Sequence, residues 1–176
     1  AIQNSTNAAI SLTATLSPSF DRIAIQNAAR SGIDGQAVTN FTLSNSFIDN
    51  VGTGAAGQYE ESNIAFHDFG AFTNSSVGGT VSITNSALTN ARRHGIDIEN
   101  GAGTIDNLTI SNNTLTSSTN AATSLGTAIL ILQQGSAATA SHLTTGTISN
   151  NTINNFPSAE GIAVARRVLC RDDPLV

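Results

Sequence analysis

Short runs of alternating apolar and polar residues recur along this chain and are separated by polar turns. Four segments align without gaps: FTLSNSFIDN from Phe41, VSITNSALTN from Val81, LTISNNTLTS from Leu108 and GTISNNTINN from Gly146. Each segment holds one aliphatic residue between two hydroxyl residues, then an Asn, a short polar step and a second aliphatic residue. Alternation with a period of two is typical of a strand with one buried face. Each segment therefore predicts two short strands joined at an Asn-containing corner.

Two columns of residues define these corners. The aligned amides are Asn45, Asn85, Asn112 and Asn150, and the weaker copy IAIQN places Asn27 in the same column. The aliphatic residues that follow are Ile48, Leu88, Leu115 and Ile153. Asn tolerates the left-handed backbone conformation that a tight corner requires. We therefore expect left-handed corners whose stacked amides can hydrogen-bond to one another.

A third column begins another strand and has a nearly constant period. Its members are Ile33, Ile64, Ile96, Ile129 and Ile162, which lie 31, 32, 33 and 33 residues apart. One strand cannot bury its inner face alone, but equivalent strands from successive coils can stack around a continuous core. The period therefore predicts an all-β chain folded as a right-handed parallel β-helix of about five coils. A β-sandwich with Asn and Ser turns is the alternative, but it would not require this period.

The repeat defines the expected domain limits. We expect residues 1–165 to form a single β-helix domain, in which Ile10, Leu12, Ala14 and Leu16 alternate as one more partial strand. Residues 166–176, RRVLCRDDPLV, form an atypical tail with five charges and the lone Cys170. No helical cap is evident at either end, although solenoids usually need caps. We therefore expect open ends, as in a fragment, through which another copy of the chain could pair.

The composition limits the classes of partner that we expect for this protein. The net charge is −5 and only 11% of the residues are charged, while Asn, Ser and Thr make up about a third of the chain. Without a basic patch to displace counterions, we expect no nucleic-acid partner. No apolar stretch reaches the length of a membrane span, and no signal peptide is evident. The sequence also predicts no cofactor, no metal site and no disulfide framework.

The repeat, with its aliphatic, hydroxyl and paired Asn positions, resembles the right-handed parallel β-helix repeats of pectate-lyase-like proteins and bacterial surface proteins. The resemblance covers most of residues 20–165. It implies a secreted or cell-surface location, since proteins of this kind are found there. It does not imply an activity, because the fold hosts lyases, hydrolases, esterases and adhesins.

The strand column also predicts one cluster of ionisable residues. If Ile96 points to the core, Asp97 and Glu99 should both face solvent on the outer side of the strand. Aligning Ile64 with Ile96 places His67 beside Glu99, in a neighbouring coil about 4.8 Å away. Arg93 and His94 lie immediately before this strand. His67, Arg93, His94, Asp97 and Glu99 are therefore the candidate catalytic residues.

Several chemistries could use such a cluster. Two carboxyl groups can act on a glycosidic bond as acid and nucleophile or base, an Arg can serve as the base of a lyase, and His with carboxylates can bind a divalent metal. The segment at His94, Gly95 and Ile96 resembles the G-H-G-I stretch of polygalacturonase-type hydrolases. That family also has N-T-D and D-D motifs near its active site, and the N-T-D motif is missing here. A G-x-S-x-G nucleophile motif is missing too.

Leu130 and Leu132 are the final candidate feature, because they should point outward next to Asp97 and Glu99. They could contact a partner, or a loop such as residues 133–146 could fold over them. Two functions therefore remain open. The first is a structural or adhesive segment of a secreted or cell-surface bacterial protein, with a polysaccharide or another copy as partner. The second is a carbohydrate-active or ester-cleaving β-helix enzyme that uses the His67, Asp97 and Glu99 face.

Overall fold

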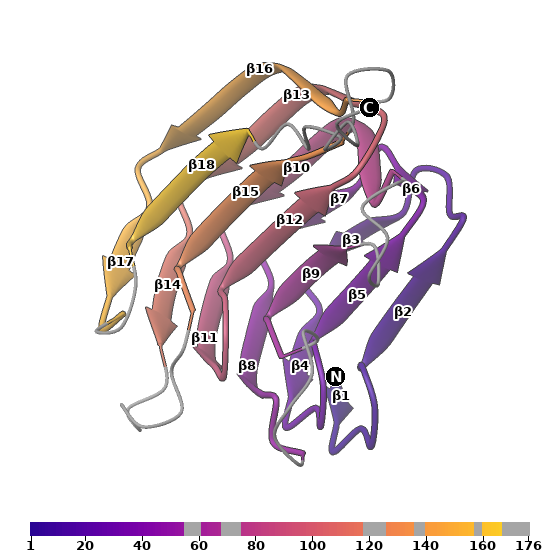
Figure 1. Cartoon of the computed structure of the whole chain (residues 1–176). Coiled ribbons are helices and arrows are strands. Elements are labelled where there is room, and N and C mark those ends of the chain that lie inside the picture. Colours follow the sequence, from indigo (N-terminus) through magenta and orange to yellow (C-terminus); the bar gives the residue numbers. More distant parts are fainter. Residues whose placement is uncertain (55–60, 68–74, 118–125, 136–139, 157–159, 167–176) are drawn as a thin grey trace, which may run out of the picture.

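The computed structural model describes residues 1–54, 61–67, 75–117, 126–135, 140–156 and 160–166. In this part of the chain the regular structure consists of strands, without a helix. The strands form three sheets in which every pairing is parallel (Figure 1). The chain visits the three sheets in turn and repeats the circuit, so the fold is a parallel β-solenoid. We call each circuit a rung.

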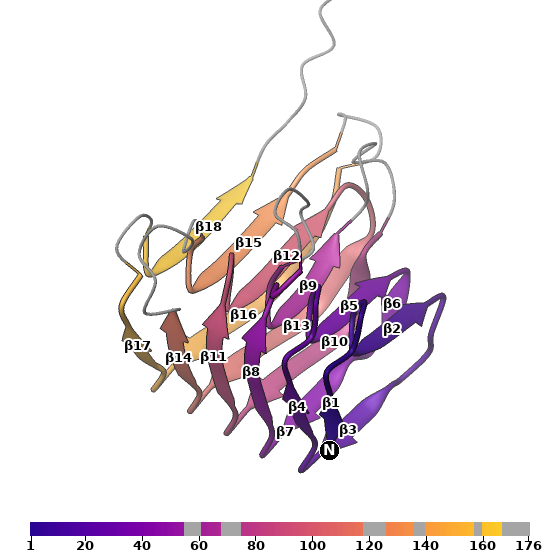
Figure 2. The same cartoon turned by 90° about the horizontal axis from the view of Figure 1, so that it is seen from below.

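The first sheet contains β1 (Ile2–Gln3), β4 (Ala24–Gln26), β8 (Phe47–Val51), β11 (Ala87–Ala91), β14 (Thr114–Ser117) and β17 (Thr152–Asn154). The second contains β3 (Ser19–Asp21), β7 (Thr42–Ser44), β10 (Val77–Thr84), β13 (Thr104–Ser111) and β16 (His142–Ser149), with β6 (Val38–Thr39) paired to β10. The third contains β2 (Ile10–Thr13), β5 (Ile33–Gln36), β9 (Ile64–His67), β12 (Ile96–Asn100), β15 (Ile129–Gln133) and β18 (Ile162–Arg166). Figure 2 shows the strands of the first sheet side by side along the stack.

The predicted column of isoleucines is confirmed by the register of the third sheet. Ile33, Ile64, Ile96, Ile129 and Ile162 are direct neighbours on successive strands, and Ile10 of β2 extends the column to the preceding rung. Ile33, Ile64, Ile96 and Ile129 are fully buried. Their stacking removes apolar surface from water at every rung, and this burial is the main favourable contribution to folding.

The core continues across the other two sheets. In the first sheet, Ile25, Ile48, Leu88 and Leu115 stack in register and are fully buried. In the second, Leu43, Ile83 and Ile110 do the same. Phe41 packs edge-on against Phe66 with 4.9 Å between the ring centroids. The alternation seen in the sequence therefore corresponds to one inward face on each sheet.

The left-handed corners predicted for the Asn column are confirmed, but the described residues show no hydrogen bonds between the stacked amides of this column, and Asn45 Nδ2 donates to Asp21 Oδ1 instead. Asn45, Asn85, Asn112 and Asn150 have φ angles of 50°, 51°, 57° and 55°. The placement of Asn27 in this column was wrong. Asn27 follows β4 and is equivalent to Asn50 at a different corner, because β4 pairs with β8. Arg22, with a φ of 53°, occupies the equivalent corner after β3 instead.

The hydrogen bonds that join one rung to the next at this corner involve the residue after each Asn. The backbone N–H of Ser46 donates to Ser86 Oγ at 3.1 Å, and the N–H of Ser86 donates to Asn113 Oδ1 at 2.9 Å. The N–H of Asn113 donates to Asn151 Oδ1, also at 2.9 Å. Because Ser86 and Asn113 are buried, these side chains satisfy backbone donors that water cannot reach.

Two expectations about the ends of the chain have different outcomes. Ile10 and Leu12 do form a strand, β2, which pairs with β5. Leu16 makes only an isolated bridge to Thr39 and is 74% exposed, so the alternation does not extend that far as a strand. Residues 167–176 of the predicted tail lie outside the described residues, and the division at residue 165 stays a prediction. The described part holds no helix that could cross a membrane.

Candidate functional site

The third sheet places the predicted cluster on adjacent strands, with the register expected from the sequence. Asp97 on β12 lies between Ala65 of β9 and Leu130 of β15. Glu99, two residues further along β12, lies between His67 and Leu132. His94 and Arg93 enter the cluster from the segment that precedes β12. The five candidate residues are therefore neighbours in space.

The expectation that this face of the strand lies in solvent was wrong for most of these residues. Asp97 is 2% exposed, His67 and His94 are also buried, and Glu99 is half-buried. All four residues of β9 are buried, so the outward face of the sheet is covered here as well as the inward one. Parallel sheets are commonly buried on both faces. Alternation along a strand predicts which residues share a face, but it does not predict whether that face is covered.

His94 is held in one protonation state by its neighbours. The backbone N–H of Thr127, on the next rung, donates to His94 Nδ1 at 3.0 Å. Burial, with a smaller contribution from the positive charge of Arg93, lowers the pKa of His94 to about 4. The neutral ring that accepts at Nδ1 carries its proton on Nε2. That nitrogen lies 3.9 Å from Asp97 Oδ2, which is beyond hydrogen-bond distance.

The two carboxyl groups of β12 are shifted in the opposite direction. Burial raises the pKa of Asp97 well above its usual value, and the negative charge of Glu99 raises it further. Burial also raises the pKa of Glu99, and Arg93 counteracts the shift at both carboxyl groups. Asp97 Oδ1 is buried without a hydrogen-bond partner. The arrangement therefore favours neutral groups over ions.

His67 forms a separate contact with the preceding rung. Its Nε2 lies 3.5 Å from Oδ1 of Asp34 on β5, and both side chains are mostly buried. Asp34 is adjacent to Ala65 in the register, so β5, β9 and β12 contribute to one continuous polar cluster. Carboxyl groups with raised pKa values can act as proton donors. In the described residues, however, no group of three or more His, Cys, Asp or Glu side chains is arranged to hold a metal.

Leu130 and Leu132 lie beside Asp97 and Glu99 as predicted, but they are half-buried. They therefore do not form a fully exposed apolar pair. The partner that the sequence suggested for them stays a prediction.

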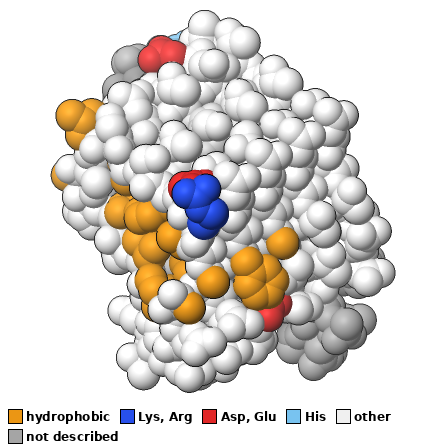
Figure 3. Space-filling view, turned by 180° about the vertical axis from the view of Figure 1, so that it is seen from behind, with side chains coloured by type: hydrophobic (Ala, Val, Ile, Leu, Met, Phe, Trp, Pro, Cys, Tyr) orange, Lys and Arg blue, Asp and Glu red, His pale blue; other side chains and the backbone are white. Residues whose placement is uncertain are grey.

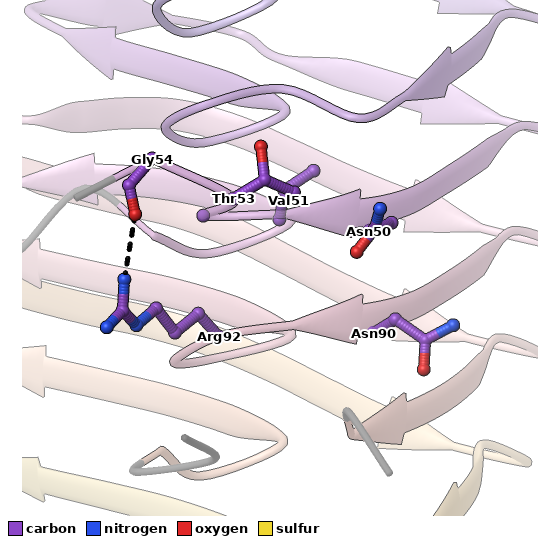
Figure 4. A pocket seen from close by; sticks show the side chains of 7 residues that line it. Asn50, Val51, Thr53, Gly54, Asn90 and Arg92 are labelled. Carbon is purple, nitrogen blue, oxygen red and sulfur yellow. Dashed lines mark hydrogen bonds between the residues drawn. The ribbon is translucent and has the colours of Figure 1, made fainter. Parts of the chain in front are cut away.

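The sequence reasoning did not identify a pocket at the corner that follows β8 and β11. This corner pocket has a volume of about 250 Å³ (Figure 4). The residues that line it are Asn50, Val51, Gly52, Thr53, Gly54, Asn90 and Arg92. The pair of glycines after β8 and the Asn residues at the ends of two stacked strands were the available signal. A second pocket involves His142, Leu143, Val164 and Arg166 beside the outermost described strands. The His67, Asp97 and Glu99 side chains line neither of these two pockets.

No protein-family model, curated protein or solved structure matches this chain. The structure itself defines its class as an all-β parallel solenoid.

Proposed function

We propose that this chain is a structural or adhesive segment of a secreted or cell-surface bacterial protein. The burial of Asp97, His67 and His94 carries the proposal, because a catalytic group must come within about 3 Å of its substrate. The outer surface supports it as well. Figure 3 shows one face made mainly of uncharged polar side chains and backbone, with few charged groups and one group of hydrophobic side chains. Such a surface suits a scaffold or a neutral polymer as partner.

We propose a right-handed β-helix of about five coils, related to the pectate-lyase-like superfamily. Connections between parallel strands of one sheet are right-handed in about 98% of cases, which supports the handedness. The nearly constant period of the isoleucine column supports the number of coils. The proposed location outside the cell rests on the resemblance of the repeat to those proteins.

A β-helix hydrolase or lyase remains the second candidate. The observation in its favour is the pair of carboxyl groups with raised pKa values on β12, next to His67 and Arg93. Active sites commonly contain such shifted groups, although structural clusters do too. In this alternative, Asp97 or Glu99 would donate a proton to the leaving group of a glycoside, a uronate polymer or an ester.

Enzyme assays distinguish the two candidates. The chain is incubated with polyuronates, neutral glycans and aryl esters, beside Asp97→Asn and Glu99→Gln, with Asp106→Asn as a control for an exposed carboxyl group. We expect no turnover by any of these proteins and retention of the chain on insoluble polysaccharide. Turnover that disappears in Asp97→Asn and Glu99→Gln but persists in Asp106→Asn would overturn the proposal in favour of the enzyme.

A further inference from the structure

A series of side-chain amides, which we call the amide ladder, runs along the corner after the first sheet. Asn27 Nδ2 donates to Asn4 Oδ1 at 3.1 Å, and Asn50 Nδ2 donates to Asn27 Oδ1 at 2.7 Å. All three residues have left-handed φ angles, between 53° and 58°. The amide nitrogens of Asn27 and Asn50 therefore donate to the preceding rung, and the amide oxygens of Asn4 and Asn27 accept from the following rung.

The amide ladder is interrupted at the next step, where the corner pocket lies. Asn90 has the same left-handed conformation, with a φ of 53°, but its Nδ2 donates to Asp49 Oδ1 at 2.8 Å instead of to Asn50. Asn50 Oδ1 consequently accepts no hydrogen bond from the described residues. Figure 4 shows Asn50 and Asn90 one above the other beside the pocket. One amide oxygen, Asn50 Oδ1, which is an acceptor only, is thus available to a ligand beside the pocket.

The opposite side of the corner pocket holds a fixed guanidinium group. Arg92 Nη1 donates to the Gly54 carbonyl oxygen at 3.1 Å and to Glu61 Oε1 at 3.3 Å. Arg92 Nε lies 3.3 Å from Glu61 Oε2. The Glu61 carboxylate therefore compensates the positive charge, while the Nη2 donors make no hydrogen bond with the described residues. Arg92 therefore offers hydrogen-bond donors to a ligand, while the Arg92–Glu61 pair carries no net charge.

Close packing requires glycine at two positions of this corner. Gly52 has a φ of +78°, and a Cβ at this position would lie 2.7 Å from Arg92 Cβ. A Cβ on Gly54 would lie 2.9 Å from the Ala29 carbonyl oxygen. Larger residues would therefore distort the corner. The volume of about 250 Å³ falls just below the roughly 300–1,000 Å³ of drug-sized sites, which suits one sugar ring.

We propose that the corner pocket binds one unit of a neutral sugar. Hydroxyl groups on opposite sides of one ring can donate to Asn50 Oδ1 and accept from Arg92 Nη2, because each hydroxyl is both donor and acceptor, and Asn90 lines the same pocket. A carboxylate or phosphate provides acceptors only, so it would meet the Asn50 amide oxygen with no proton to share. This inference deepens the proposed adhesive role by naming the class of ligand and the residues that hold it.

Titration followed by nuclear magnetic resonance tests the proposal on the whole chain. The probes are the methyl glycosides of glucose, galactose and mannose, with galacturonate as the anionic comparison, each at up to about 100 mM, which saturates a site with a Kd near 1 mM. We expect the amide signals of Gly52 and Gly54 to shift with at least one neutral glycoside. The absence of such shifts with all three, or tighter binding of galacturonate, would overturn the proposal.

Three Asn→Gly variants test the residues involved, because glycine keeps the left-handed backbone while removing the amide. Asn50→Gly and Asn90→Gly should each weaken binding at least tenfold. Asn112→Gly, at an equivalent corner conformation outside the corner pocket, is the matched control and should bind normally. Unchanged binding in both pocket variants would overturn the assignment. This solution measurement is independent of adhesion to insoluble polymers, so the inference and the proposed function can fail separately.

Discussion

The backbone N–H of Thr127 donates a hydrogen bond to Nδ1 of His94, 3.0 Å away on the neighbouring rung. The Thr127 carbonyl oxygen lies 3.3 Å from the same nitrogen, but Nδ1 cannot donate to it while accepting from the N–H group. A proton added to Nδ1 would remove that acceptor. The neutral ring is therefore part of the connection between β12 and β15.

This relationship predicts that acid destabilises the fold through His94. In the native state the pKa is lowered to about 4, whereas an unfolded His titrates near 6.5. As the pH falls from about 6.5 to 4, the unfolded state gains a proton that the native state excludes, so the free energy of unfolding should decrease by up to about 3 kcal/mol.

His94→Gln should show a smaller decrease in the free energy of unfolding over that range. Urea unfolding at several pH values measures the difference between the two proteins. His142→Gln is the control, because this His is exposed on β16. Parallel pH profiles for the wild-type protein and His94→Gln would contradict the assignment.

Asp97 should have the opposite effect. Its native pKa is raised by burial and by Glu99, so above pH 3.8 the unfolded state loses a proton that the native state keeps. The free energy of unfolding therefore falls as the pH rises through this range. Relative to the wild type, Asp97→Asn should become progressively more stable between pH 4 and pH 8. Thermal unfolding measures this trend, and Asp106→Asn supplies an exposed comparison. A stability difference that does not change with pH would refute the prediction.

Asn100 is the last residue of β12. Its substitution should lower the free energy of unfolding more than substitution of most other polar residues. Its Oδ1 accepts from the N–H groups of Ser76 and Val77 at 2.8 and 2.9 Å, and its Nδ2 donates to the Val77 carbonyl oxygen at 2.8 Å. All of these groups are buried. Asn100→Ala leaves several of them unsatisfied and should reduce the free energy of unfolding by about 3 kcal/mol or more. Chemical denaturation of Asn100→Ala and of the exposed control Asn107→Ala measures the effect, and equal stabilities would rule it out.

The sequence predicted the features of this fold that depend on local pattern. The period of two gave the inward positions, and the spacing from Ile33 to Ile162 gave the register of the third sheet. The misplacement of Asn27 had a physical cause. Two different corners can end in Asn, and only the pairing of β4 with β8 distinguishes them.

The environment of the candidate site could not be predicted in the same way. The sequence brought His67, Asp97 and Glu99 together correctly, because their positions follow from strand register. Their burial depends on what covers the outer face of the sheet, and strand alternation contains no information about that. The break in the amide ladder at Asn90, beside the corner pocket, could not be predicted either, because only side-chain geometry reveals it.

The outermost described strand predicts association between copies. On β18, Ile162 and Val164 continue the inward columns but are 45% and 58% exposed. Their spacing matches Ile10 and Leu12 on β2 at the opposite end of the sheet. We therefore expect the mass measured by light scattering to rise with protein concentration, and Val164→Glu to suppress the rise. A constant monomer mass at all concentrations would exclude this contact.

The hydrogen bonds at Ser46, Ser86 and Asn113 give the solenoid a direction. Each of these backbone donors is satisfied by a side chain of the rung that comes later in the chain. During synthesis from the N-terminus, a corner thus emerges with an unpaired donor and is completed only when its successor docks. These corners should therefore form in order from the N-terminus. The most recently synthesised rung should stay the least stable until the next rung has docked onto it.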